Sequence, residues 1–168
     1  MLEARLPVPI EEYGLAQDSC GAGRFRGGLG LVRSYRLLAE EAVLQLRSDR
    51  RRFRPCGLAG GAPAAASQNS LLEESGAARS LPSKVTMTIR RGDLVRHVHP
   101  GGGGHGDPLA RELELIERDL ADGKISRGYA ESRHGVIVRP ATLAIDRAAS
   151  LRRRSGLRRL GEAGNATA

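Results

Sequence analysis

Four consecutive glycines, in the stretch "HPGGGGHGDPL" at residues 99–109, limit the possible fold more than any other part of the chain. Glycine has no side chain to pack and loses more backbone freedom on folding than any other residue. A folded protein keeps such a run where its backbone approaches another backbone or a ligand, or as a flexible linker. Directly after the run, Asp107 is a suitable N-cap and Pro108 suits the first helical position. The glycines therefore lead into the start of a helix.

The helix that follows has the clearest periodicity in the chain. Its apolar residues recur at spacings of 4, 3 and 4 and form one stripe, which consists of Leu109, Leu113, Ile116 and Leu120. Gly123 follows as a left-handed residue that ends the helix. The sequence predicts one amphipathic helix here.

Two further helices are predicted downstream. Ser126 is placed to cap a short helix that ends at His134, where the helix dipole favours a protonated imidazole. Residues 136–138 are expected to be extended. The last helix is expected to start near Asp146 and to continue through the arginines of "LRRRSGLRRL".

Upstream of the glycines, two stretches of alternating residues predict antiparallel hairpins. The first joins residues 31–38 to residues 43–46 through a turn at Glu40 and Glu41. The second joins residues 85–89 to residues 94–99 through the turn "RRGD". The expected fold class is therefore α+β: strand-rich with antiparallel hairpins, followed by short C-terminal helices.

Composition narrows the function classes. Aromatic residues make up 3% of the 168 residues, so the core is aliphatic, and base-stacking platforms for nucleic acid are scarce. The net charge is +8, and half of it lies in residues 141–168. Such a tail could bind nucleic acid or anionic lipid, but a solvated arginine-rich helix is the simpler interpretation. We therefore expect no nucleic-acid partner.

Apolar runs, the start of the sequence and the two cysteines indicate the compartment. No apolar run is long enough to span a membrane, and the start lacks the pattern of a signal peptide. Cys20 and Cys56 fit no metal or disulfide spacing. A cytoplasmic protein is expected.

Three segments together carry a resemblance to a known family. They are "GAGRFRGGLGLVRSYRLLAEEAVLQLRSDRRRFRPCGLAGG", "LPSKVTMTIRRGDLVRHVHPGGGGHGDP" and "DLADGKISRGYAESRHGVIV", in this order and with compatible spacing. The chain resembles the C-terminal portion of the hydantoinase B / 5-oxoprolinase family. The resemblance covers roughly residues 3–150, so residues 1–150 are expected to form a truncated region of that type and residues 151–168 a flexible tail.

The resemblance implies an ATP-dependent hydrolase that acts on cyclic amides such as 5-oxoproline or hydantoins. It implies a partner subunit of the hydantoinase A type, which binds ATP, and a divalent metal ion in the complete enzyme. The family's metal ligands lie in the N-terminal half of the B component, so neither cofactor is expected in this chain. The chain is then expected to be a fragment that is inactive alone. A non-enzymatic module that docks on a hydantoinase A-like partner remains the alternative, and a small basic nucleic-acid binder is a weaker one.

The first candidate site is the glycine loop, with the residues Gly101, Gly102, Gly103, Gly104, His105 and Asp107. Backbone amides at a helix start can bind an anion, so the loop could line a substrate site. The lysine and hydroxyl residue of a P-loop are missing. Structural packing against the part of the family outside this chain is the favoured interpretation. His105 stands where the family usually has an aromatic residue.

The second candidate site is the charged cluster of Asp49, Arg50 and Arg51, just after a predicted strand. The planar guanidinium group suits a carboxylate, which 5-oxoproline carries. A salt-bridged or interface cluster is the alternative. His97 and His99 share one face of a strand, but no carboxylate completes a metal site, so no metal is expected. No catalytic residue can be assigned.

Strand faces are expected to be exposed in so short a chain. If the chain is part of a larger core, Leu31, Val32, Leu44 and Leu46 should lie on its surface.

Overall fold

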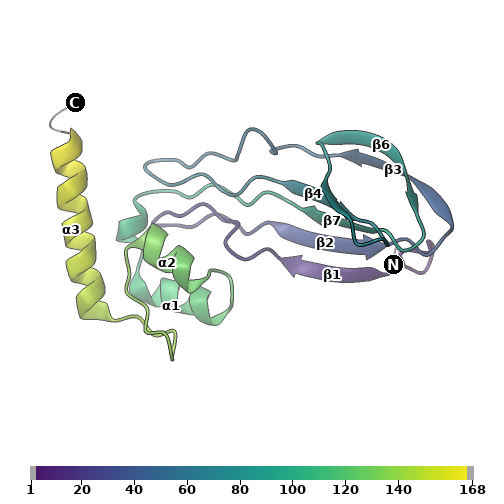
Figure 1. Cartoon of the computed structure of the whole chain (residues 1–168). Helices are drawn as coiled ribbons and strands as arrows, with labels where there is room; N and C mark the ends of the chain where they lie inside the picture. Colours follow the sequence, from purple (N-terminus) through teal and green to yellow (C-terminus); the bar gives the residue numbers. More distant parts are fainter. Residues whose placement is uncertain (1–2, 166–168) are drawn as a thin grey trace.

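The computed structural model describes the backbone of residues 3–165 and the side chains of residues 3–160, and it contains two antiparallel sheets followed by helices (Figure 1). The larger sheet has five strands in the order β1-β2-β7-β4-β5, and β3 pairs with β6 in a separate ribbon. The strands are β1 (Ile10–Leu15), β2 (Leu31–Arg36), β3 (Glu41–Arg47), β4 (Gln68–Leu72), β5 (Ala78–Ser80), β6 (Lys84–Arg90) and β7 (Leu94–Val98). The predicted fold class, α+β with antiparallel strands and short C-terminal helices, is confirmed.

Both predicted hairpins are wrong, although their strands exist. β2 pairs with β1 and β7, whereas β3 pairs with β6 along its whole length. The two predicted turns lie side by side and are joined by two backbone hydrogen bonds. The amide of Arg91 donates to the carbonyl of Glu40 at 3.0 Å, and the amide of Gly92 donates to the carbonyl of Leu37 at 2.9 Å. The chain changes sheets at each turn instead of folding back on itself. Alternation shows that a segment is a strand, but it does not say which strand is its partner.

The β3–β6 ribbon folds over one face of the larger sheet and buries a shared core. This core contains Leu37, Leu44, Leu46, Leu71, Leu81, Ile89 and Val95. The expected exposure of strand faces is therefore mostly wrong: Val32, Leu44 and Leu46 are 4%, 8% and 8% exposed, and Leu31 is 40% exposed. Leu44 and Leu46 belong to β3 of the ribbon, and the larger sheet of the same chain covers them.

The predicted helix after the glycines is divided into two parts. Asp107 caps a short 3-10 helix, Pro108–Ala110, by accepting the amide of Leu109 at 2.8 Å. Arg111 is extended, and the helix α1 (Leu113–Ala121) begins after it. Gly123 has the predicted positive φ, +66°. Ser126 caps the helix α2 (Arg127–His134), as predicted, by accepting the amide of Tyr129 at 3.1 Å.

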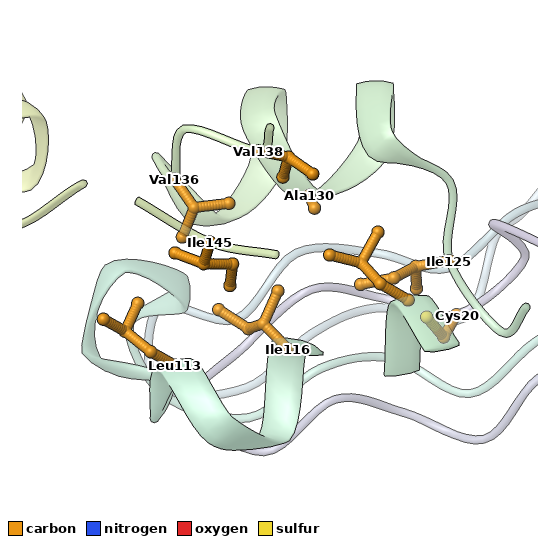
Figure 2. Packing of buried hydrophobic residues seen from close by; sticks show 9 residues of the cluster. Cys20, Leu113, Ile116, Ile125, Ala130, Val136, Val138 and Ile145 are labelled. Atoms are coloured by element: carbon orange, nitrogen blue, oxygen red, sulfur yellow. The ribbon is translucent and has the colours of Figure 1, made fainter. Parts of the chain in front are cut away.

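A second core lies between α1, α2 and the extended segment after them (Figure 2). Leu113, Ile116 and Leu120 of the predicted stripe are buried in it. Val138 and Ile145 contribute from the two sides of an isolated β-bridge. The stripe was therefore assigned to the correct face.

The last helix, α3 (Arg147–Asn165), starts next to the predicted Asp146 and runs past residue 150. Polar contacts attach it to the rest of the molecule. Arg154 is 7% exposed and donates to the carbonyls of His134 and Arg111, at 2.8 Å each. Arg147 pairs with Glu114 at 2.5 Å. A division into residues 1–150 and a tail of residues 151–168 stays a prediction, and residues 166–168 lie outside the described residues. Among the helices described, none is both long and apolar enough to cross a membrane.

Candidate functional site

Three glycine-rich segments, residues 20–30, 56–62 and 100–106, lie side by side as extended chain between the larger sheet and the helices (Figure 1). We call this arrangement the glycine layer. Backbone hydrogen bonds join the segments. The amide of Gly102 donates to the carbonyl of Gly28 at 2.8 Å, and the amide of Gly104 to that of Ala62 at 3.0 Å. The amide of Ala62 donates in turn to the carbonyl of Ala22 at 2.7 Å. All three segments are thus held together without side chains.

The close approach of these backbones explains the glycine run. A Cβ on Gly103 would lie closer than 3.0 Å to the carbonyl oxygen of Cys56, and one on Gly104 would lie equally close to the carbonyl of Ala22. The same is true of several glycines in the other two segments, among them Gly21, Gly27, Gly30, Gly57 and Gly61. The packing interpretation of the run therefore agrees with the structure, but the run packs against this chain's own backbone. A region outside this chain, which was the expected packing partner, is not needed to explain the glycine run.

The other residues of the first candidate site also make structural contacts. His105 forms β-bridges with Phe25 and Leu58, and its amide donates to the carbonyl of Phe25 at 2.9 Å. Asp107 caps the 3-10 helix and pairs with Arg158 at 3.3 Å. The amides of Gly102 and Gly104 donate to carbonyls, so they do not face an anion. A substrate-binding role for this loop stays a prediction.

The second candidate site lies apart from the glycine layer. Asp49, Arg50 and Arg51 line a hollow of about 440 Å³ that contains no glycine of the layer. Arg51 donates to the hydroxyl of Ser80 at 2.7 Å, and the backbone carbonyl of Asp49 accepts the hydroxyl of Ser67 at 2.5 Å. The hollow therefore has guanidinium groups at its rim, as a carboxylate site requires, and carboxylate binding there stays a prediction.

Sequence reasoning missed a buried charge cluster that joins the glycine layer to the helices. Asp119 is 3% exposed and accepts from Arg26 at 2.9 Å and from Arg111 at 2.7 Å. Arg111 also donates to the carbonyl of Arg24 at 3.2 Å. Arg26 and Asp119 lie 93 residues apart in the chain, so no local pattern reveals the pair.

Tyr129 makes a second link between the helices and the glycine layer. Its hydroxyl donates to the carbonyl of Cys20 at 2.7 Å, and burial raises the pKa of this phenol, which keeps the donated proton in place. Burial also raises the pKa of the Cys20 thiol, so this residue lacks the thiolate that a nucleophile needs. Both cysteines are free, and Cys56 is exposed.

The histidines divide into separate environments. His97 and His99 pack edge to face with ring centroids 4.2 Å apart, and His105 lies in the glycine layer. Among the described residues, no three His, Cys, Asp or Glu side chains are grouped so that they could hold a metal ion. His134 is fully buried, and its Nδ1 lies 3.1 Å from the carbonyl of Pro108. Burial lowers the pKa of His134 to about 4, so the expected cationic cap is wrong: the imidazole is neutral.

This neutral histidine predicts a loss of stability in acid. An unfolded chain protonates His134 near pH 6.5, whereas the folded chain resists protonation until about pH 4. The unfolded state thus binds more protons between these values, and the free energy of unfolding should fall by on the order of 3 kcal/mol as the pH drops through this range. Urea unfolding at pH 7.5 and at pH 4 measures this fall in the free energy of unfolding. His134→Gln should show a smaller fall than the parent chain, and an equal fall would contradict the assignment.

Comparison with known proteins decides the family. The family described as Hydantoinase B/oxoprolinase matches residues 1–108, which include both sheets and the whole glycine layer. The chain belongs to this family. Subunit beta of the caprolactamase from Pseudomonas jessenii is 32% identical over 148 residues, which cover 82% of this chain and 24% of the relative. This Hydantoinase B/oxoprolinase chain thus spans about a quarter of the length of that relative.

Solved structures share the fold. The crystal structure of the ATP-dependent caprolactamase from Pseudomonas jessenii has a TM-score of 0.79 and 31% identity, and the match covers 92% of this chain and 27% of that one. Nucleotide-free acetone carboxylase has a TM-score of 0.82 over 96% of this chain and 26% of its own chain. Its identity of 23% is evidence for the fold alone. The arrangement of sheets and helices described above therefore recurs in the caprolactamase structure.

Proposed function

We propose that this chain is part of the B-type component of an ATP-dependent hydrolase that opens cyclic amides. The observation that carries the proposal is its likeness to the ATP-dependent caprolactamase, at 31% identity over 92% of the chain. The family resemblance extends the substrate class to 5-oxoproline and hydantoins. Within such an enzyme the glycine layer is a rigid scaffold, because its backbones are in direct contact.

We infer that catalysis needs other parts of the assembly. The complete enzyme would use ATP and a divalent metal ion, together with a hydantoinase A-like subunit and the remaining length of the B-type component. No group of described side chains in this chain fits a metal ion. Asp49, Arg50 and Arg51 are the residues we would place nearest a substrate carboxylate. The cytoplasm is the compartment that we propose.

An alternative is a docking module without activity of its own. Large apolar side chains that would suit such a role are exposed, including Tyr13 at 68%, Phe53 at 73% and Leu58 at 64%. A docking module would bind a hydantoinase A-like partner. Added as a separate chain to a complete enzyme, it would leave that enzyme's rate of hydrolysis unchanged. Nucleic-acid binding has less support, because only 3% of the residues are aromatic.

A segment exchange tests the proposal. The purified chain should show no turnover of caprolactam, hydantoin or 5-oxoproline with ATP. Caprolactamase subunit beta in which the matching segment is replaced by this chain should keep ATP-dependent hydrolysis when it is combined with the rest of that enzyme. The chimera carrying Gly103→Val should lose activity, whereas Gly28→Ala, where an added Cβ meets nothing within 4 Å, should keep it.

The outcomes separate the alternatives. Hydrolysis by the purified chain alone would refute the expectation that it is inactive. A chimera that folds and assembles but does not hydrolyse caprolactam would favour the docking module.

A further inference from the structure

A hollow of about 210 Å³ lies between the larger sheet and β3, at the edge of the first core. Its floor is formed by β2 and β7, where Arg33 and His97 are direct neighbours, and Asn69 of β4 lies next to His97 on the other side. Arg47 and Gln45 of β3 and His99 complete its polar lining. At about 30 Å³ for each water molecule, the hollow has room for a small organic acid or a phosphate group.

The charge of this hollow is not compensated. Its lining contains two arginines and two histidines but no carboxylate. Among the described side chains, no Asp or Glu lies within ion-pair distance of Arg33 or Arg47. The opposite face of the same strands differs, because Glu12 there accepts from Arg96 at 2.9 Å and from Ser34 at 2.8 Å. Positive charge therefore collects on one face only.

A hydrogen-bond chain fixes the orientation of His97. The hydroxyl of Ser48 lies 3.4 Å from the carbonyl of Ser83, to which it donates, and it accepts the amide group of Asn69 at 2.7 Å. The amide oxygen of Asn69 therefore faces Nδ1 of His97, which must be the protonated nitrogen. Nε2 of His97 is then left with a lone pair that can take up a proton. Asn69 is 1% exposed, so this orientation is held by a buried group.

We propose that this hollow binds a small oxyanion, a carboxylate or phosphate group, through Arg33 and Arg47, with His97 and His99 as hydrogen-bond partners. Guanidinium groups suit both kinds of anion. A cation is disfavoured, because both guanidinium groups would repel it. The proposal is independent of the hydrolase activity, since binding is a property of this chain alone.

Binding should be coupled to proton uptake. The charged groups that act on His97 are His99, which follows β7 directly, and Arg33 of β2. Tyr35, Gln45 and Arg47 line the same hollow, and Asn69, which contacts His97, is neutral. Burial, His99 and Arg33 lower the pKa of His97. A bound anion favours the imidazolium, so affinity should rise as the pH falls from 8 to 6. Acetate stays ionised throughout this range and reports the change without its own titration.

Titration of the full chain with sodium phosphate and with sodium acetate, followed through the imidazole proton resonances, tests the proposal. We expect saturable shifts of the His97 and His99 resonances with at least one of the anions. The anion that binds more tightly shows whether the hollow prefers a phosphate group or a carboxylate. Arg33→Gln should weaken binding roughly tenfold, which corresponds to one charge-assisted hydrogen bond. Arg118→Gln removes the same charge from an exposed position on α1 and should leave binding unchanged.

Two results would overturn the proposal. They are the absence of saturation with both anions and equal weakening in Arg33→Gln and Arg118→Gln. Neither of these results bears on the proposed hydrolase function, which the segment exchange tests separately.

Discussion

A single methyl group added at Gly103 should strongly destabilise the fold of this chain. The new Cβ would lie closer than 3.0 Å to the carbonyl carbon and oxygen of Cys56, and backbone atoms cannot turn aside as a flexible side chain can. To make room, two strands of the glycine layer would have to separate and lose the hydrogen bonds between them. We expect Gly103→Ala to lower the free energy of unfolding by roughly 3 kcal/mol or more, measured by urea unfolding.

Two neighbouring glycines give matched controls. A Cβ on Gly102 would lie 3.0 Å from the amide nitrogen of Gly28 and at least 3.6 Å from any other atom, so Gly102→Ala should cost clearly less than Gly103→Ala. Gly28→Ala meets nothing within 4 Å and should be neutral or slightly stabilising, since alanine restricts the unfolded chain. Equal effects at Gly103 and Gly28 would show that the run is only a linker.

Loss of the carboxylate of Asp119 should have the second large effect. Its side chain is 5% exposed and forms ion pairs with both Arg26 and Arg111, of which Arg111 is 7% exposed. Asp119→Ala would leave an uncompensated buried charge, which typically costs about 3–5 kcal/mol. Thermal and urea unfolding should both report this loss, and Asp119→Asn should recover part of it because the amide oxygen can still accept one hydrogen bond.

Asp122 is the control for this cluster. It lies three residues further along the chain and pairs with Lys124 at 2.8 Å, but on the surface. Exposed pairs contribute little, so Asp122→Ala should leave the unfolding transition unchanged. If Asp122→Ala and Asp119→Ala behaved alike, the buried cluster would not be a determinant of stability.

Helix boundaries were predictable because their signals are local. Gly123 and Ser126 lie within one turn of the helix that each of them ends or begins, and their conformations depend on those neighbours. The stripe of α1 was predictable for the same reason, since helical spacing alone defines its buried face. The extended conformation of Arg111 was not, because this residue is held by its contacts with Asp119 and with α3.

Strand pairing depends on partners far away in the chain. β3 and β6 lie about forty residues apart and pair along their whole length, whereas the nearer β2 joins a different sheet. The alternation of residues in β3 suits either partner equally well, so a hairpin was the wrong choice between two acceptable pairings.

The candidate sites were also only partly predictable, because their parts come from distant stretches of the chain. The run at residues 101–104 indicated a close backbone approach, but its partners, residues 20–30 and 56–62, could not be read from the run itself. His97 and His99 were recognised as sharing a strand face. Their neighbours Arg33 and Arg47 come from two other strands, so the hollow exists only in the folded chain.

The glycine layer also restricts how the gene for this chain can change. Every glycine codon begins with two guanines, and a substitution at either of them that still encodes an amino acid replaces glycine with a residue that carries a Cβ. At positions such as Gly21, Gly27, Gly103 and Gly104, that atom would collide with backbone. Among the nucleotides of these codons, only the third is then free to drift. Glycines such as Gly14 and Gly28, where an added Cβ would meet nothing within 4 Å, should accept replacements. Deep mutational scanning should thus reveal this backbone layer as a set of intolerant glycines in three separate stretches of sequence.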